Sequence, residues 1–242
     1  MHDTLVIVPA YNESLNIGNV LQNLLEQVKD ADILVVNDGS VDETELTARR
    51  YGVTVVSHPC NMGYGAALQT GYKYALLMGY AFVIQFDADG QHNPGDIDRI
   101  RAQLTVPGTD VVIGSRFLAD ANFSPGTMKM MAIHFFRAVI RGITKTSITD
   151  PTSGLRGLSR RAFSLYSQFK WFPADFPDAD ILIDILLHGR TVVEVPVHSQ
   201  VRHYGTSMHA GLKPIIYMFK VSLSILVVVV NYLIERRDLR SE

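Results

Sequence analysis

Short apolar runs of strand length recur along this chain, and most of them are separated from the next by a stretch with helical character. Runs of three to six residues are too short for a helix but typical of buried strands. Strands that alternate with helices pair in parallel through right-handed crossovers, so helices cover both faces of the sheet. The pattern therefore predicts an α/β fold with a mostly parallel central sheet. The expected strands are Leu5–Val8, Ile33–Val36, Val53–Val56, Phe82–Phe86, Val111–Ile113 and Val192–Val197.

Composition excludes several other classes of protein. The chain has 242 residues, 47% of them hydrophobic and 19% charged, with a net charge of −2 and one cysteine, Cys60. This length can bury a substantial core, and the apolar content is too high for a disordered chain. One cysteine cannot form a disulfide framework or a cysteine-ligated zinc site, which is typical of a reduced, cytoplasmic protein. Nucleic acid is not an expected partner, because the basic excess of a nucleic-acid binder is missing.

Acidic and polar residues follow the predicted strands, where an α/β sheet binds its ligands. The usual phosphate-binding loops are not found: no G-x-G-x-x-G follows the first strand, and there is no Walker P-loop. Asp87 and Asp89 instead stand directly after an apolar strand, with Gln91 close behind. Their oxygens suit Mg²⁺ or Mn²⁺ bridging a diphosphate, although a solvated turn has a similar composition.

Six ordered motifs resemble those of glycosyltransferase family 2, and most closely its dolichyl- or polyprenyl-phosphate mannosyltransferase branch. The resemblance covers about the first 210 residues. It implies a GT-A fold, which is Rossmann-like, and an inverting transfer from a nucleotide-diphosphate sugar. The motifs are Pro9–Glu13, Asn37–Asp42, Asn61–Ala67, Asp87–Gln91, Gly114–Arg116 and Asp150–Arg156.

The resemblance implies roles for the residues in these motifs. Asp89 and Gln91 are expected to ligate Mg²⁺ or Mn²⁺, and Asp87 to lie near the ribose and diphosphate. Gly65 is expected to let the backbone approach the nucleotide, unless its small size serves only helix-to-sheet packing. The residues expected to line the base and ribose pocket are Pro9, Tyr11, Glu13 and Asp38.

Two further motif residues are expected at the sugar and phosphate groups. Arg116 follows the fifth strand and can grip a phosphate of the donor or of the acceptor, the alternative being a surface salt bridge. Ser153 lies in a polar loop that is expected to shape the sugar pocket, or else only to satisfy a turn.

One position departs from the branch. Asp180 stands where family members with hydroxyl acceptors have their catalytic base, usually a Glu in this branch. An acceptor phosphate is already anionic and needs no base, whereas a sugar hydroxyl does. Asp180 therefore leaves both acceptor classes open. We expect Asp89, Asp180 and Arg116 to carry the catalytic roles.

Two segments predict contact with a membrane. Pro214–Ile234 forms an apolar helix, but its uncharged part after Lys220 spans only roughly 21 Å, less than the roughly 30 Å of a bilayer core. An interfacial helix, or one docked on a small membrane protein partner, fits better. We therefore divide the chain into a catalytic domain, 1–211, and a membrane-associated amphipathic or apolar helix, 212–242.

The second segment is a helical stretch from Met128 to Lys145. Arg137, Arg141 and Lys145 recur at every fourth position, so they can meet lipid headgroups or an acceptor phosphate. Core packing with a solvated basic stripe is the alternative. Arg202, in a loop similar to the branch's Arg-x-x-Gly-x-Ser, is a further phosphate ligand, although Met208 replaces the Lys that usually follows.

The sequence thus predicts a metal-dependent hexosyltransferase on the cytoplasmic face of a membrane, acting on a polyprenyl phosphate. Transfer to a hydroxyl of a lipid-linked or polysaccharide glycan, with Asp180 as base, is the first alternative. A non-catalytic nucleotide-binding subunit of a membrane complex is the second. The donor base and sugar stay open, because Tyr11 and Asp38 suit uracil and guanine alike.

Overall fold

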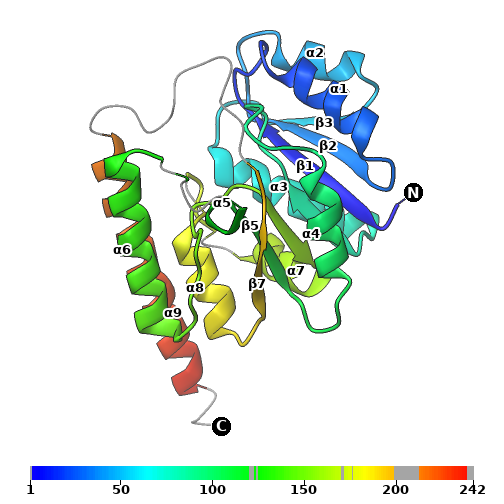
Figure 1. Cartoon of the computed structure of the whole chain (residues 1–242). Helices are drawn as coiled ribbons and strands as arrows, with labels where there is room; N and C mark the ends of the chain where they lie inside the picture. The colour runs from blue at the N-terminus through cyan, green and yellow to red at the C-terminus, as the bar shows by residue number, and fades with distance from the viewer. Residues whose placement is uncertain are drawn as a thin grey trace.

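The computed structural model describes residues 2–119, 123, 125–169, 172–175, 177–198 and 213–238. In this part of the chain, seven strands form one sheet in the order β3-β2-β1-β4-β6-β5-β7 (Figure 1). The strands are β1 (Thr4–Ala10), β2 (Asp32–Asn37), β3 (Thr54–Ser57), β4 (Phe82–Gln85), β5 (Val111–Ser115), β6 (Arg156–Ser159) and β7 (Val192–Pro196).

Helices cover both faces of this sheet, which confirms the predicted α/β class (Figure 1). The helices expected near 128–145 and 214–234 are both present. The helices of the described residues are α1 (Ile17–Gln27), α2 (Thr44–Arg50), α3 (Tyr64–Met78), α4 (Asp96–Leu104), α5 (Arg116–Ala119), α6 (Thr127–Thr144), α7 (Arg160–Gln168), α8 (Ala179–Leu187) and α9 (Lys213–Asp238).

The two faces of the sheet bury two separate cores, and alternate residues of a strand enter each. In β1, Leu5 and Ile7 enter the core shared with α3, α7 and α8. Val6 and Val8 enter the core shared with α1 and α4. Successive side chains of a strand point to opposite faces, so a strand covered on both sides must be apolar throughout. This explains why the strands were visible as continuous apolar runs.

β6 was missed by the sequence analysis, which predicted no strand between Val111–Ile113 and Val192–Val197. It runs antiparallel to β4 and β5, whereas the other strand pairs are parallel. Its four residues, Arg156–Ser159, contain no apolar run, because only Leu158 has a large apolar side chain. Arg156 pairs with Gln85 and Ile113, near the carboxyl ends of the two neighbouring strands. The loop before β6 is therefore delivered to the edge of the sheet where ligands bind.

α6 and α9 pack with α8 outside the sheet layers and lie side by side (Figure 1). One face of α9 is buried against its neighbours through Tyr217, Val221, Ile225 and Val228. Within the described residues, one stretch, Tyr217–Arg236, is long and apolar enough to cross a membrane by length and composition, and only 22% of it is buried in the protein. The exposed apolar side chains on α9 are Phe219, Leu223, Leu226, Val227, Val230, Leu233 and Ile234.

Candidate active site

The predicted site residues meet at one edge of the sheet. The carboxyl ends of the parallel strands β1, β2, β4 and β5 lie at this edge, together with the loop before β6. Ligands of open α/β sheets bind outside these strand ends. The residues placed here are Pro9, Tyr11 and Glu13 after or in β1, Asp38 after β2, Asp87, Asp89 and Gln91 after β4, Arg116 after β5, and Ser153 before β6.

The loop after β1 presents one aromatic ring to solvent. Tyr11 is 45% exposed, whereas Pro9 is buried in the strand and Glu13 is half-buried. Asn12 holds the loop in place with a left-handed backbone (φ 54°), and its side-chain oxygen accepts a hydrogen bond from the N–H of Val41 at 3.0 Å. The loops after β1 and β2 are thus tied together, and Tyr11 is left as an open stacking surface.

Asp38 lies deeper than the sequence analysis expected. Its side chain is almost fully buried, and Oδ1 accepts a hydrogen bond from the N–H of Met62 at 2.9 Å and contacts Nδ1 of His58 at 2.7 Å. Oδ2 accepts one from the N–H of Gly63 at 2.8 Å. The carboxylate of Asp38 therefore positions the start of α3. Its direct contact with a nucleotide stays a prediction.

Asp87 is held by two residues that the sequence analysis did not assign to the site. The hydroxyl of Tyr64 donates to Oδ1 at 2.8 Å, and Nε2 of His92 lies 2.9 Å from Oδ2. Burial alone raises the pKa of this carboxyl, but His92, Tyr64 and the charge of Arg116 together lower the pKa below its ordinary value. A Cβ on Gly154 would overlap the carboxylate, so a glycine is needed there. Asp87 is therefore ionised and fixed in orientation.

Asp89 and Gln91 form the turn that follows, where Oδ1 of Asp89 accepts a hydrogen bond from the N–H of Gln91 at 3.0 Å. Among the described residues, no group of three His, Cys, Asp or Glu side chains is arranged to hold a metal by itself. Mg²⁺ is commonly held by one or two carboxylates, with substrate phosphates and water completing its shell. The oxygen donors of Asp89 and Gln91 fit this kind of site.

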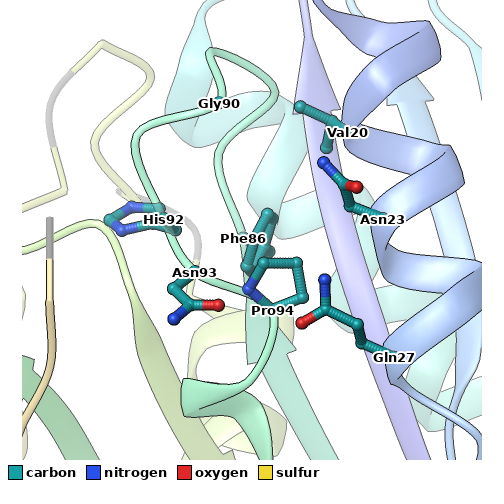
Figure 2. A pocket seen from close by; sticks show the side chains of 8 residues that line it. All are labelled: Val20, Asn23, Gln27, Phe86, Gly90, His92, Asn93 and Pro94. Carbon is teal, nitrogen blue, oxygen red and sulfur yellow. The ribbon is translucent and has the colours of Figure 1, made fainter. Parts of the chain in front are cut away.

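A pocket of about 210 Å³ lies between α1 and the loop after β4 (Figure 2). The amide side chain of Gln27 on α1 points toward Pro94 across it, whereas that of Asn23 lies nearer Val20 (Figure 2). Neither Asp87 nor Asp89 lines this pocket, so it is distinct from the acidic groups of the site. The lining residues are Val20, Asn23, Gln27, Phe86, Gly90, His92, Asn93 and Pro94.

Arg116 lies at the end of β5, as predicted, but it is already paired. Its Nε and Nη2 donate to Oδ2 and Oδ1 of Asp150 at 2.7 and 2.8 Å. Asp150 is completely buried, and the guanidinium carbon of Arg116 lies 5.0 Å from the centre of the Phe123 ring. The pair holds the guanidinium in a fixed position at the strand ends.

Lys129, in the first turn of α6, is a second cation at the site, and the sequence analysis missed it. Burial, followed by repulsion from Arg116, lowers the pKa of Lys129, while Asp150, Asp178 and Asp89 oppose this shift. These interactions place Lys129 within electrostatic range of the strand-end residues. A lysine whose charge acts on both Arg116 and these carboxylates is a candidate ligand for an anion at the strand ends. The signal in the sequence was weak, because Lys129 stands apart from the repeating cations of the same helix.

Arg137 points into the protein. Its Nε and Nη2 donate to the carbonyl oxygen of Thr149, the first of these at 2.7 Å, and its guanidinium carbon lies 4.3 Å from the Phe117 ring centre. Arg137, Arg141 and Lys145 therefore do not share one environment. Arg137 supports the loop before β6, whereas Arg141 and Lys145 are exposed to solvent. Arg202 lies outside the described residues.

Ser153 and Arg156 shape the loop before β6. Ser153 is only 1% exposed, and its hydroxyl is one of two buried side-chain polar groups in the described part of the chain that have no hydrogen-bond partner. Arg156, which is also buried, donates to the carbonyl oxygens of Ser153 at 2.8 Å and Pro151 at 2.7 Å. An orphan hydroxyl held by a rigid loop is suited to a ligand that supplies the missing bond.

Asp180 does not reach the open site. Its side chain is completely buried, Oδ1 accepts hydrogen bonds from the N–H groups of Asp178 and Ile181, and Oδ2 accepts one from the Ser224 hydroxyl at 2.5 Å. Burial raises the pKa of Asp180 to about 6, although these hydrogen bonds oppose the shift. Asp180 is therefore enclosed by the described part of the chain, and its role as a base stays a prediction.

Gly65 makes its close approach to the protein's own backbone. Its N–H donates to the carbonyl oxygen of Ala174 at 2.6 Å, and a Cβ at this position would overlap the carbonyl oxygen of Pro173. The small size of Gly65 thus serves packing in this structure, and its approach to a nucleotide stays a prediction.

Comparison with known proteins agrees with this arrangement. The family model for Glycosyl transferase family 2 matches residues 5–166. The chain is 30% identical over 240 residues to UDP-N-acetylglucosamine–dolichyl-phosphate N-acetylglucosaminyltransferase from Methanococcus voltae, covering 88% of this chain and 94% of that protein. It is 29% identical over 230 residues to polyprenol monophosphomannose synthase from Mycolicibacterium smegmatis, covering 90% and 85%.

The fold is similar to that of glucosyl-3-phosphoglycerate synthase from Mycobacterium tuberculosis. Its complex with phosphoglyceric acid has a TM-score of 0.70 at 20% identity, covering 93% of this chain and 79% of that one. Its complex with Mn²⁺, uridine diphosphate and phosphoglyceric acid has a TM-score of 0.67 at 18% identity, covering 95% and 78%. At this identity the likeness shows the fold alone, which is the GT-A fold expected. Because the family model matches two thirds of the length of this chain, the chain belongs to glycosyltransferase family 2.

Proposed function

We propose that this enzyme transfers a hexose from a nucleotide-diphosphate sugar to a polyprenyl phosphate, such as dolichyl or undecaprenyl phosphate, with inversion at the anomeric carbon. The observation that carries the proposal is Arg116, which the buried Asp150 fixes at the end of β5, at the same edge of the sheet as the acidic loop after β4. Lys129 is the proposed second cation. Lys129 is on α6, whose outer surface exposes Met128, Met131 and Phe135. An anion site bordered by an apolar helix suits a phosphate on a lipid.

The donor is assigned to the ends of β1, β2 and β4. Tyr11 offers a stacking face for the base, and the carboxylates of Glu13 and Asp38 are the proposed contacts to base and ribose, with Pro9 in the same wall. Asp87 is the proposed ligand of the ribose and diphosphate, and the unpartnered hydroxyl of Ser153 that of the sugar. The backbone at Gly65 borders this pocket. Mg²⁺ or Mn²⁺, held by Asp89 and Gln91, supplies positive charge that offsets the charge on the departing diphosphate.

The acceptor is assigned to the cations. Arg116 and Lys129 bind the acceptor phosphate, and an oxygen of that phosphate attacks the anomeric carbon opposite the departing diphosphate. The phosphate is ionised at neutral pH, so the step needs no general base. The burial of Asp180 agrees with this, because it leaves the hydroxyl-acceptor reaction without its base. Arg137 supports the site from behind, and Arg202 stays a predicted phosphate ligand.

The names of the two relatives support a lipid acceptor, since one contains dolichyl phosphate and the other polyprenol. The exposed apolar faces of α6 and α9 are the proposed contact with the membrane surface. One face of α9 packs against the protein, which favours an interfacial position of the helix. We propose that this interface is the cytoplasmic face of the membrane. We propose the division into a catalytic domain, 1–211, and a membrane-associated helix, 212–242, and a small membrane protein as a possible partner of that helix.

A transfer assay tests the proposal. The protein is incubated with labelled UDP- and GDP-sugars, Mn²⁺ or Mg²⁺ and a short polyprenyl phosphate, and the lipid is extracted. Label in the lipid, with an inverted anomeric configuration by NMR, is the expected result. Tight nucleotide binding without transfer from any common donor would overturn the proposal in favour of a non-catalytic subunit. Exchanging the lipid phosphate for a glycan acceptor tests the hydroxyl alternative in the same assay.

A further inference from the structure

The inner face of α9 contacts a short segment, residues 172–175 and 177–180, which we call the acidic segment. The hydroxyl of Tyr217 donates to Oδ2 of Asp178 at 2.5 Å, and the hydroxyl of Ser224 donates to Oδ2 of Asp180 at 2.5 Å. We infer that α9 is a positioning element of the donor site, with Tyr217 and Ser224 as positioning residues that act through the acidic segment. The inference rests on the proposed function for the identity of that site.

The acidic segment holds the start of α3. The carbonyl oxygen of Ala174 accepts hydrogen bonds from the N–H groups of Gly65 at 2.6 Å and Ala66 at 3.3 Å. These N–H groups belong to the first turn of the helix, where they have no partner within the helix itself. The preceding residue, Tyr64, donates its hydroxyl to Asp87. A displacement of the acidic segment would therefore release the residues that orient Asp87.

A second connection runs through Arg156. Nη2 of this buried side chain donates to Oδ1 of Asp178 at 3.2 Å. Oδ2 of the same carboxylate accepts the hydrogen bond from the Tyr217 hydroxyl. The guanidinium also donates to the carbonyl oxygens of Pro151 and Ser153. Tyr217 is thus linked, through Asp178 and Arg156, to the loop that carries the orphan hydroxyl of Ser153.

The contacts of α9 differ in strength. Asp180 is completely buried, so losing the Ser224 hydroxyl would leave a carboxylate oxygen without this donor in a site that water does not reach. Lys220 pairs with Asp175 at 2.5 Å, but both side chains are about half exposed and solvent screens the pair. Tyr217 and Ser224 therefore carry the connection, and Lys220 adds little.

The two faces of α9 thus have separable tasks. The face toward α8 holds the acidic segment, whereas Leu223, Leu226 and Leu233 on the other side are exposed. The helix proposed to contact lipid is the same helix that holds the donor site. Substitutions on the two faces are expected to change different measurements.

The test uses the full chain with Tyr217→Phe, Ser224→Ala and the double substitution. Ser222→Ala is a matched control, because the Ser222 hydroxyl bonds only the Met218 carbonyl of its own helix. Hydrogen exchange of the peptide covering residues 64–67 is measured, together with the Kd of UDP and of GDP in the presence of Mn²⁺. We expect the double substitution to speed exchange at Gly65 and Ala66 roughly tenfold and to weaken nucleotide binding at least roughly threefold.

Ser222→Ala is expected to change neither measurement. Ser224→Thr keeps the hydroxyl, so this variant is expected to show the parent values. Unchanged exchange at residues 64–67 in the double variant would overturn the inference. So would exchange that rises equally in β1, because that result indicates general destabilisation. The exchange measurement needs no substrate, so it stands even if no donor sugar is transferred and the proposed function fails.

Discussion

Arg116 and Asp150 form a two-point ion pair in which Asp150 is completely buried and the Arg116 side chain is 11% exposed. Removing one partner of such a pair leaves the other charge desolvated without compensation. We expect Asp150→Ala to lower the free energy of unfolding by about 3–5 kcal/mol, measured by urea denaturation. Arg49→Ala, which breaks the exposed pair with Glu45, is the control and should cost less than about 1 kcal/mol. Equal costs for the two substitutions would contradict this account of the site.

Asp89 provides a test of metal use. We expect chelation to abolish transfer and added Mn²⁺ or Mg²⁺ to restore it. Asp89→Asn is expected to lower kcat by roughly 10²–10³-fold and to raise the Mn²⁺ concentration needed for half-maximal rate, because one anionic ligand is lost. Asp30→Asn is the control, since Asp30 is 74% exposed and precedes β2 at the opposite edge of the sheet. Full activity after chelation would exclude the proposed role of Asp89.

Asp180 predicts a pH dependence of stability. Burial raises the pKa of Asp180 to about 6, compared with an ordinary value of 3.8. The folded state therefore binds a proton at Asp180 more tightly than the unfolded state does. The stabilisation that results is complete below about pH 4 and is lost as the pH rises through about 6. Relative to Asp180→Asn, the parent protein should lose up to about 3 kcal/mol of unfolding free energy between pH 4 and 7.5. Exposed Asp98→Asn should follow the parent curve. An identical pH slope for Asp180→Asn would contradict the prediction.

The same substitution separates the two acceptor classes. Because an asparagine at position 180 can still accept the Ser224 hydrogen bond, we expect transfer to a polyprenyl phosphate to stay within roughly fivefold of the parent rate. A loss by orders of magnitude would instead indicate that Asp180 acts as a base. The rates are measured at pH 7.5 with saturating metal.

If Lys129 binds the acceptor phosphate, its removal should impair use of the acceptor and leave donor binding unchanged. Lys129→Ala should lower kcat/KM for polyprenyl phosphate by roughly ten- to hundredfold, through loss of a charge-assisted hydrogen bond. The Kd of the nucleotide should change by less than roughly twofold, because the donor is assigned to other strand ends. Lys129→Arg should restore much of the activity, and Lys145→Ala, at the exposed end of α6, should have no effect. An equal loss of donor binding would place Lys129 at the diphosphate instead.

The strands and the acidic strand ends could be predicted because their signals are local. A strand buried on both faces needs apolar residues on both, and β1 and β5 show this as continuous runs, Leu5–Val8 and Val111–Ile113. β6 could not be recognised, because Arg156–Ser159 has no such run and its pairing partners, Gln85 and Ile113, lie more than 40 residues away. Its antiparallel direction brings Ser153 and Asp150 to the site.

The local sequence pattern could not predict the hydrogen-bond partners of the polar residues. Asp38 accepts hydrogen bonds from the backbone at Met62 and Gly63, and its contact with a nucleotide stays a prediction. Asp180 accepts a hydrogen bond from Ser224, which is 44 residues away, and its role as a base stays a prediction. Each carboxylate has the residue type that its motif predicts, but the side chain that satisfies it comes from another element.

The sequence by itself determined the family, the parallel strands of the sheet and the acidic residues after β4, because each depends on neighbouring residues or on an ordered set of motifs. Only the tertiary structure decided which charges stay available to a ligand. A buried charge must be paired or hydrogen-bonded, and the partner is selected by how distant elements pack. Arg137 thus binds the carbonyl oxygen of Thr149, whereas the buried Asp150 holds Arg116 at the strand ends.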